Sequence, residues 1–473
     1  YVSPASTEHS PDELFRLATH ELERAARAVG RHGFWAEGYI ATLKARRDCG
    51  ESPDSTNLKR LDELRTFLEP RRLVDRVRVY VLPRQWGTFD IATAEERTGI
   101  DTIARLQVLE ELVIDLGKEL IGDEEALGLL LPELSSGSPG RARALGRGLA
   151  TAAFEFERYW QFFVAALSAV PAGDQNPDLL RGFLGIVHER APATATKMLD
   201  DAVTNAVLSP FLVELQLEAA IDTAAVTRLR EALHSGATPV KRFARLYLGH
   251  ASNSASPSDF AQLLRDIAAR PDGHPVAVEV LYMQSIASRS NTQPVIDGVL
   301  LCCGQDLLRT FKFEDYCQAD GYALSELAKI CLVGDAQITT EHLCKNILAQ
   351  IGPFVFVPDC IEQLLLVVIV TQTSTVLDEF FLNAAKGKEV QHWNAGDDFL
   401  SSVLAGAPVA QILAWAELDS DARFPLLAGS VGLFKKEHGA KLPELSPVAR
   451  ALVENASVDS VMRCNTVMNR ASI

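Results

Sequence analysis

The most constraining feature of the sequence is a series of proline residues, each of which opens an apolar segment with helical periodicity. Proline suits the first turn of a helix, because its missing N–H would have no partner there and its backbone angle is already helical. The segments between these prolines are roughly 12–20 residues long, a common length for helices. The sequence therefore predicts consecutive helices joined by short loops. The starts are Asn176-Pro177, Ala191-Pro192, Ser209-Pro210, Thr238-Pro239, Ser256-Pro257 and His274-Pro275.

Other local signals also favour helix over strand. Residues 10–13 (SPDE) form a capping box with proline at the first helical position, and Gly30 ends the apolar pattern that follows. Alternation with a period of two, which is typical of strands, is confined to residues 76–82 (RVRVYVL). Leu73, Val77 and Tyr80 also share one helical face, so we predict a helix there. The expected fold is all-α, with at most one or two short strands.

Two consecutive segments in the middle of the chain are similar to one another. Residues 226–248 (VTRLREALHSGATPVKRFARLYL) and 260–283 (FAQLLRDIAARPDGHPVAVEVLYM) both read as a helix, a short loop and a second helix that starts near a proline. Leu229 matches Leu263 at a separation of 34 residues, within the range of helical-hairpin repeats. Each hairpin exposes an apolar face that only a neighbour can bury. We predict helical hairpins stacked as an α-solenoid; the alternative is two adjacent hairpins in a compact α domain.

Breaks in composition divide the chain into predicted regions. Loops are expected at residues 83–99, 134–140 and 393–398. We also predict one extended helix over residues 141–170, which would bridge two lobes. The regions are a neutral, Arg-rich helical region at 1–90, a helical connector at 91–135, the α-solenoid body at 140–392 and a C-terminal helical cap at 393–473.

The net charge of −16 is unevenly distributed along the chain. Residues 1–90 contain 15 Lys and Arg against 14 Asp and Glu, whereas residues 91–473 contain 31 against 48, a net charge of −17. An acidic surface repels a phosphate backbone, so we do not expect nucleic acid as a partner. The same surface attracts a basic protein, and this attraction weakens as salt screens the charges.

The cysteines and the apolar runs indicate the environment of the chain. The eight cysteines have no C-x-x-C spacing, and six of them fall in apolar helical patterns. We interpret these as reduced thiols that serve as small hydrophobic residues in a cytoplasmic protein. The six cysteines are Cys302, Cys303, Cys317, Cys331, Cys344 and Cys360.

The longest apolar run, residues 364–370 (LLLVVIV), is far shorter than a membrane span of about 20 residues and predicts a fully buried helix segment. We expect no signal peptide and no membrane association.

Motifs for catalysis or cofactor binding are missing from the sequence. It has no G-x-x-x-x-G-K-[ST] loop for nucleotide phosphates. The H-E-x-x-H zinc pattern fails after His20 and after His188, because Arg24 and Pro192 occupy the positions of the second histidine. We therefore predict that the chain is not an enzyme and has no catalytic, cofactor-binding or metal-binding residues. The alternative is an active site assembled from scattered residues.

Four groups of residues have a functional interpretation beside a structural one. A dense aromatic cluster, in which Phe156, Trp160 and Phe163 share a helical face, is either core or a partner groove. Three arginines, on one face if the helix is continuous, are either solvated or an anion-binding patch. A loop with a histidine and two aspartates is either plain surface or an acid–base site. A set of Cys and His residues has no common zinc spacing. The groups are Phe154, Phe156, Tyr159, Trp160, Phe162 and Phe163; Arg65, Arg72 and Arg76; His392, Trp393, Asp397 and Asp398; and Cys331, His342, Cys344 and Cys360.

Several stretches in the C-terminal half resemble a known group of proteins. Residues 274–286 (HPVAVEVLYMQSI) lead into residues 304–308 (GQDLL), and residues 415–436 (WAELDSDARFPLLAGSVGLFKK) precede residues 445–449 (LSPVA). In helical texture they resemble the C-terminal region of large bacterial NTPases of the STAND type and related anti-phage defence proteins. The resemblance covers about residues 220–456 and implies a sensor made of helical repeats. It carries over no functional residue, since no NTPase core accompanies it in this sequence.

The predicted function is that of a protein-binding α-solenoid, the sensor or scaffold part of a multidomain bacterial defence protein. Its predicted binding surface is the inner face of a curved stack formed by residues 200–456. The alternatives are a domain that assembles copies of itself into a homo-oligomer, and an enzyme with a site that no motif reveals. A single sequence does not distinguish inner from outer helix faces, so it predicts no contact residues.

Overall fold

The computed structural model describes most of the chain. The predicted capping box at residues 10–13, Arg65, and the loop that contains His392 and residues 393–398 lie outside the described part. Contacts between Cα atoms divide the chain into two compact units, Tyr1–Ala219 and Ala220–Ile473, which are treated separately below. The described residues are 70–83, 102–248, 255–287, 296–316, 321–351, 359–383, 403–431 and 445–454, with the single positions 20, 24, 59, 63 and 66.

Helices begin where the prolines and caps predict them. Pro257 opens α14 (Pro257–Ala268), and the Ser256 hydroxyl before it accepts a hydrogen bond from the backbone N–H of Asp259 at 3.1 Å. Residues 73–80, the one candidate strand, form the helix α4 (Leu73–Tyr80). Within the described ranges every regular element is a helix, and the single β-type pairing is an isolated bridge between Ser136 and Gln175. The predicted all-α fold is confirmed.

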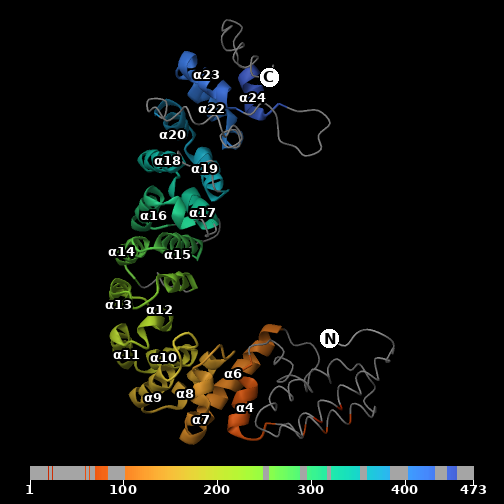
Figure 1. Ribbon diagram of the computed structural model, residues 1–473, viewed down its shortest axis with the longest axis vertical. Helices are drawn as coiled ribbons and strands as arrows, with labels where there is room; N and C mark the ends of the chain where they lie inside the picture. The colour runs from red at the N-terminus through yellow and green to blue at the C-terminus, as the bar shows by residue number, and fades with distance from the viewer. Residues whose placement is uncertain are drawn as a thin grey trace. The chain divides into compact units, whose positions relative to one another are not determined.

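The first unit is a stack of helices in two rows (Figure 1). In one row α8 packs between α6 and α10; in the other α9 packs between α7 and α11. α4 packs on α6 and α7 at one end, and α12 packs on α10 and α11 at the other. The remaining bounds are α6 (Thr102–Leu120), α7 (Glu124–Leu134), α8 (Ala142–Ala152), α9 (Phe156–Ser168), α10 (Asp178–Arg190), α11 (Pro192–Thr204), η3 (Ser209–Phe211) and α12 (Leu212–Gln216).

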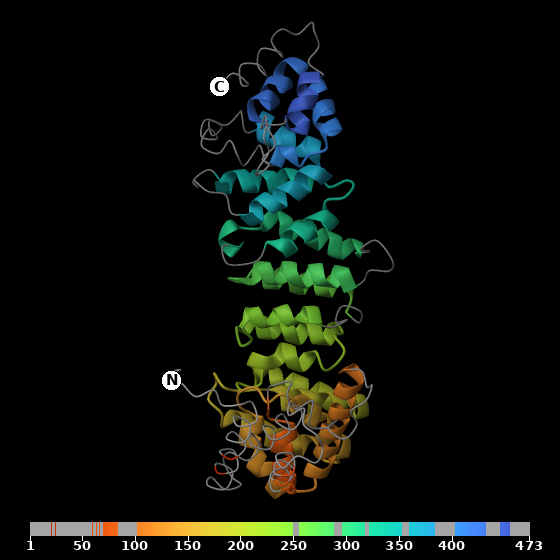
Figure 2. The same cartoon turned by 90° about the vertical axis from the view of Figure 1, so that its right-hand side faces the viewer.

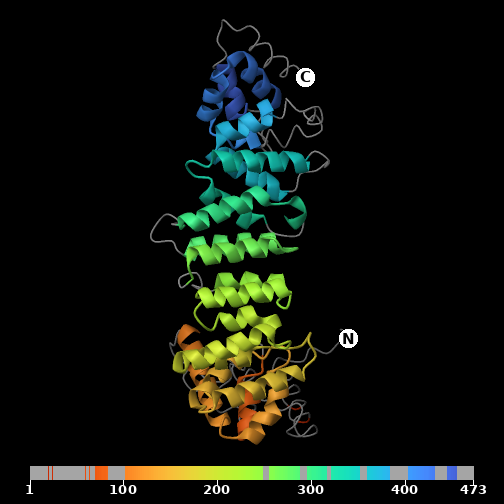
Figure 3. The same cartoon turned by 90° about the vertical axis from the view of Figure 1, so that its left-hand side faces the viewer.

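The second unit repeats the arrangement, with successive hairpins in parallel layers (Figures 2 and 3). One row contains α13, α14, α16, α18, α20 and α22, and the other contains η4, α15, α17 and α19, each in contact with its neighbours in the row. The bounds are α13 (Thr223–Ser235), η4 (Val240–Leu248), α15 (Gly273–Ala287), α16 (Gly298–Thr310), η6 (Phe313–Tyr316), α17 (Tyr322–Cys331), α18 (Gln337–Ile351), α19 (Asp359–Thr371), α20 (Thr373–Leu377), η7 (Asp378–Asn383), α22 (Val409–Glu417), α23 (Ser420–Ser430) and α24 (Pro447–Glu454).

The predicted sequence repeat corresponds to two consecutive hairpins, α13 with η4 and α14 with α15. The matched residues Leu229 and Leu263 are both fully buried. In the second matched pair, Ile267 is fully buried and Leu233 is 1% exposed. The second helix of the first hairpin differs from the expectation, since η4 is a 3₁₀ helix. The prediction of helical hairpins stacked as an α-solenoid is confirmed within each unit.

Hydrogen bonds between neighbouring hairpins recur at a nearly constant sequence separation. Arg158 on α9 bonds Glu124, 34 residues earlier, and Arg147 on α8 bonds Glu110, 37 residues earlier. In the second unit Arg230 bonds Asp266 at a separation of 36. Equivalent positions in stacked repeats lie one repeat apart, so the interval reports the repeat length. The pattern is present in α6 and α7, N-terminal to residue 140 where the solenoid body is predicted to begin.

The prediction of one extended helix over residues 141–170 is wrong. The chain forms two helices, α8 and α9, separated by residues 153–155, and Ala153 at the end of α8 has an extended backbone. Arg190 at the end of α10 caps the end of α8, because its Nη1 donates to the carbonyls of Ala150 at 2.6 Å and Thr151 at 2.8 Å. The last carbonyls of a helix have no partner within the helix. The end of α8 is therefore stabilised by a residue about 40 positions away.

The apolar run at residues 364–370 lies in α19, as predicted, but it is not fully buried. Leu364, Leu365 and Val368 are buried, whereas Val370 is 48% exposed. The run therefore covers the packed face of a helix and part of its open face. Among the described residues, no helix combines the length and apolar character that a membrane span requires.

Candidate functional site

Glycines bring three helices of the first unit into backbone contact. Gly148 on α8 faces Gly117 on α6, and Gly146 on α8 and Gly182 on α10 each lie against the backbone of the other helix. A Cβ at Gly182 would lie 1.8 Å from the Arg143 carbonyl oxygen, and one at Gly148 would lie 2.0 Å from the Ile114 carbonyl oxygen. Any side chain at these positions would therefore push the helices apart. The close approach makes a continuous three-helix surface of α6, α8 and α10.

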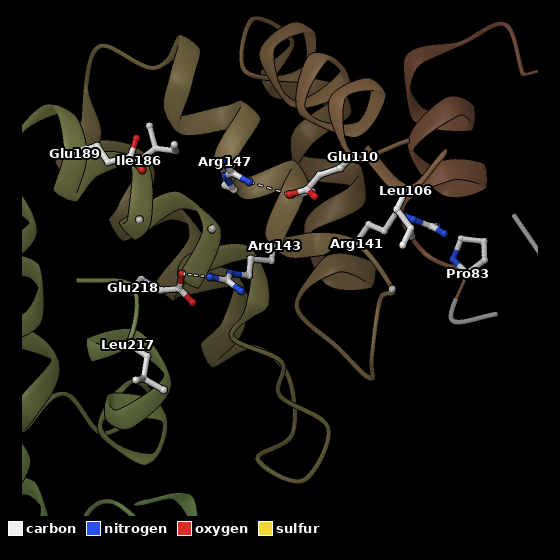
Figure 4. A pocket seen from close by; sticks show the side chains of 14 residues that line it. Pro83, Leu106, Glu110, Arg141, Arg143, Arg147, Ile186, Glu189, Leu217 and Glu218 are labelled. Carbon is white, nitrogen blue, oxygen red and sulfur yellow. Dashed lines mark hydrogen bonds and ion pairs between the residues drawn. The ribbon is translucent and has the colours of Figure 1, made fainter. Parts of the chain in front are cut away.

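A groove of about 800 Å³ lies on this surface (Figure 4). Its volume is within the range of about 300–1,000 Å³ that is usual for ligand sites. The lining combines three arginines and three glutamates with a few apolar side chains, and glycines leave helix backbone at its wall. The lining residues are Pro83, Leu106, Glu110, Gly140, Arg141, Arg143, Ala144, Arg147, Gly182, Gly185, Ile186, Glu189, Leu217 and Glu218.

Arg143 and Arg147 are one helical turn apart on α8 and line the groove together (Figure 4). Arg147 donates from Nη1 to Glu110 Oε1 on α6 at 2.8 Å, and both side chains are about half exposed. Arg143 donates from Nη2 to Glu218 Oε2 at 2.6 Å. Side chains four residues apart lie on the same helix face, so both arginines extend from one face of α8, Arg147 toward Glu110 on α6 and Arg143 toward Glu218.

Glu218 is the anchor at one end of the groove. Its side chain is only 5% exposed, and it also accepts hydrogen bonds from Arg181 on α10 at 2.8–2.9 Å. A carboxylate this buried is stable when it is paired and hydrogen-bonded. Gly185 leaves space beside it, because a Cβ there would be 3.6 Å from Glu218 Oε2.

Arg141 closes the other end of the groove, just before α8. It donates from Nη1 to the carbonyl oxygen of Tyr80 at 3.0 Å, which ties α8 to the end of α4. Burial lowers the pKa of the Arg141 guanidinium from its usual value, because the charged form loses water. Arg141 therefore has a structural role, which is to hold the start of α8 against the end of α4 at this end of the groove.

The aromatic cluster predicted as core or partner groove is core in part. Trp160 and Phe163 are buried, and the Phe163 ring packs edge-on against Phe183 with a centroid distance of 5.2 Å. Phe154, in the break before α9, is 93% exposed. None of the cluster lines the groove. The helical face predicted for Phe156, Trp160 and Phe163 packs toward α10.

The three arginines predicted to share one helix face do not do so. α4 begins at Leu73, and residues 70–72 before it are not helical, so the helix is not continuous from residue 65. Arg72 is exposed, and Arg76 forms an ion pair with Glu119 on α6 at 2.7 Å. Arg76 therefore fastens α4 to α6, and the single continuous helix on which the predicted patch depends is absent at residues 70–72.

The cysteines follow the hydrophobic interpretation in part. Cys303, Cys331 and Cys344 are buried, free thiols, whereas Cys302 is exposed. His342, proposed beside them as a metal ligand, is exposed and its Nδ1 lies 2.8 Å from the Ile338 carbonyl oxygen of its own helix. A search of the described residues finds no group of three or more His, Cys, Asp or Glu side chains placed to hold a metal ion. The side chain of Cys360 lies outside that search.

Sequence reasoning did not find the groove residues. Their local signals were the Arg143 and Arg147 pair and the glycines at positions 146 and 148 inside a helical pattern. A glycine in a helix interior costs stability unless packing requires it, so two on α8 indicate close helix contact. The partners on α6 and α10 could not be read from the sequence.

The fold and the groove define the class of this protein as an all-α helical-repeat protein. Searches against family models, curated proteins and solved structures give no match to the chain.

Proposed function

We propose that the protein is a protein-binding α-solenoid and that its partner binds in the groove over α6, α8 and α10. The observation that carries the proposal is the groove itself, which combines exposed ion pairs, apolar side chains and accessible helix backbone. Stacked helical repeats commonly bind proteins through surfaces that extend over several repeats. The sensor or scaffold role in a bacterial defence protein, implied by the resemblance of residues 220–456, is part of this proposal. The groove is lined mainly by residues before position 200, and the inner face of residues 200–456, predicted from the sequence as the binding surface, stays a prediction.

The charge distribution supports a protein partner of net positive charge. Inside the groove, three arginines balance three glutamates. The surplus of Asp and Glu over residues 91–473 therefore lies outside the groove. A negative surface attracts a basic protein at long range and repels nucleic acid. Association should weaken as salt rises, because the screening length is about 10 Å at 0.1 M salt.

The experiment is affinity capture from bacterial lysates, with and without phage infection, using the full chain and two variants. Ala144→Trp places a large side chain in the groove, and Ala165→Trp, on the exposed face of α9, is the matched control. We expect one partner that binds the unmodified chain and the control but not Ala144→Trp. Equal capture by all three proteins would reject the groove as the binding site. Tight DNA binding without protein capture would reject the proposed protein-binding function.

A second candidate function is self-assembly. It is favoured by two exposed apolar side chains, Val333 in the α17–α18 turn at 69% exposure and Ile338 in the first turn of α18 at 66%. Exposed apolar surface is typical of contact sites. Light scattering tests it: a dimer or higher oligomer that becomes monomeric in a Val333→Ser, Ile338→Ser double variant would favour assembly over partner binding.

A further inference from the structure

We infer that the groove recognises a carboxylate side chain of an extended peptide, which binds between Arg143 and Arg147. The inference rests on the proposed function, because it names the ligand chemistry of the same groove. It starts from the way the two arginines are held. Each donates to its glutamate through a single nitrogen, Nη2 of Arg143 and Nη1 of Arg147. A guanidinium has five N–H donors, so most donors of both remain for a ligand.

The existing ion pairs leave the arginines positioned but not saturated. The Arg143 and Arg147 side chains are 55% and 42% exposed, and Glu110 is 51% exposed. Ion pairs in contact with water contribute little to stability, because water competes for both groups. A ligand carboxylate that accepts two parallel N–H bonds from one guanidinium makes the stronger, bidentate contact. Glu218, which is 5% exposed and also pairs with Arg181, fixes the acceptor of Arg143, and the donors that neither glutamate uses are available to a second acceptor.

The charge of the groove selects a carboxylate over a phosphate group. Glu110, Glu189 and Glu218 line the same groove as the arginines. A phosphate group carries close to two negative charges at neutral pH and would face all three glutamates. A single carboxylate adds one charge and can share the donors of Arg143 and Arg147.

Apolar residues on both sides of the arginine pair define the rest of the ligand. Leu106 comes from α6 and Ile186 from α10, so they flank the α8 arginines on opposite sides (Figure 4). Helices in contact through glycine lie closer than the usual 8–10 Å. Side chains two residues apart on one face of an extended peptide are about 6.6–7 Å apart. A peptide that crosses the three helices then matches the pattern apolar-x-acidic-x-apolar.

The test uses three displayed sets of random heptapeptides with the central residue fixed as Glu, Gln or Lys. Each set is selected against the 473-residue chain, against the Arg143→Gln, Arg147→Gln double variant, and against Ala144→Trp, which fills the groove. Arg158→Gln is the matched control, because Arg158 on α9 is 56% exposed and also pairs with a glutamate of a neighbouring helix, outside the groove. Circular dichroism checks that each variant keeps its helix content.

We expect selection from the Glu set only, with apolar residues two positions on either side of the glutamate. Binding should weaken at least tenfold in the double variant and be unchanged in Arg158→Gln. Equal selection from the Glu and Gln sets, with loss of binding in Ala144→Trp, would overturn the carboxylate inference and leave the proposed function in place. Selection from no set, or binding that Ala144→Trp leaves intact, would overturn both.

Discussion

At the residue scale, burial decides how the thiols of the second unit react. Burial raises the pKa of Cys303 to about 11 and that of Cys331 to about 12, because the thiolate loses water, and it also raises the pKa of Cys344. The thiolate is the reactive form. At pH 8 a thiol with a pKa of about 11 is ionised in roughly one molecule per thousand. Cys302, next to Cys303 on α16, is exposed.

We therefore predict that iodoacetamide at pH 8 modifies Cys302 of the native protein well before Cys303, Cys331 and Cys344. Peptide mass mapping over time measures each site separately. Labelling in urea is the control, since all four thiols should then react at similar rates. Rapid native labelling of Cys303 would contradict the predicted order.

A buried histidine supplies a pH-dependent contribution in the same unit. His274 lies between the Tyr316 hydroxyl, 2.9 Å from Nδ1, and the Leu307 carbonyl oxygen, 2.9 Å from Nε2. A carbonyl only accepts, so Nε2 carries the proton and Nδ1 accepts from the tyrosine. Desolvation lowers the pKa of His274, against smaller opposing effects that include the nearby Asp315. The folded protein therefore holds this histidine neutral.

The sign of the pH effect follows from that lowered pKa. Below about pH 6.5 the unfolded chain binds a proton that the folded chain resists, so the contribution of His274 is present above this pH and is lost as pH falls. We predict that His274→Gln lowers the free energy of unfolding by about 1–3 kcal/mol at pH 7.5. The difference in the free energy of unfolding between wild type and variant should be smaller at pH 5.5. Urea unfolding at both pH values measures it, and a constant or larger difference at pH 5.5 would refute the assignment.

At the element scale, the groove depends on the glycine contacts of α8 with α6 and α10. Two glycines on α10 provide a matched pair. A Cβ at Gly182 would overlap the Arg143 carbonyl oxygen, whereas a Cβ at Gly185 would meet only Glu218 atoms at 3.6 Å or more. Both residues line the groove and both are helical.

We predict that Gly182→Ala lowers the melting temperature and Gly185→Ala does not. Alanine gains about 1 kcal/mol of helix propensity at either site. At Gly182 this is outweighed by overpacking, which typically costs about 1–3 kcal/mol. Thermal unfolding followed by circular dichroism compares the two variants. If Gly182→Ala were as stable as Gly185→Ala, the backbone contact between α8 and α10 would be wrong.

At the scale of the whole molecule, each unit is a one-dimensional stack in which a hairpin contacts mainly its neighbours. Stability in such a stack is a sum of hairpin and interface contributions, so damage remains local. Leu263 on α14 and Leu127 on α7 are both fully buried, one in each unit. Truncating a buried leucine to alanine typically costs about 2–5 kcal/mol.

We predict that Leu263→Ala speeds amide hydrogen exchange in α13 to α16 and leaves α8 and α10 unchanged. Leu127→Ala should speed exchange in the helices of the first unit and leave α13 to α16 unchanged. Hydrogen exchange with mass spectrometry resolves both regions in one experiment. Faster exchange throughout both units in either variant would show that the chain unfolds as one cooperative body.

The local features of the fold could be predicted from the sequence, because they depend on residues close together in the chain. Pro257 and Ser256 start α14 by a contact within four residues. Leu229 and Leu263 reveal the repeat, since the same local pattern recurs at each hairpin. The all-α fold and the stacked hairpins follow from such caps and apolar periodicities.

The groove and the helix break depend on the tertiary structure, because each requires contacts between residues one or two repeats apart. Arg190 caps the end of α8 from a separate helix, at the point where the helical pattern of residues 141–170 divides into two helices. Arg143 reaches Glu218 across 75 residues, and Arg147 reaches Glu110 across 37. The sequence shows that these residues are charged. Only the packing of α6, α8 and α10 places them in one groove.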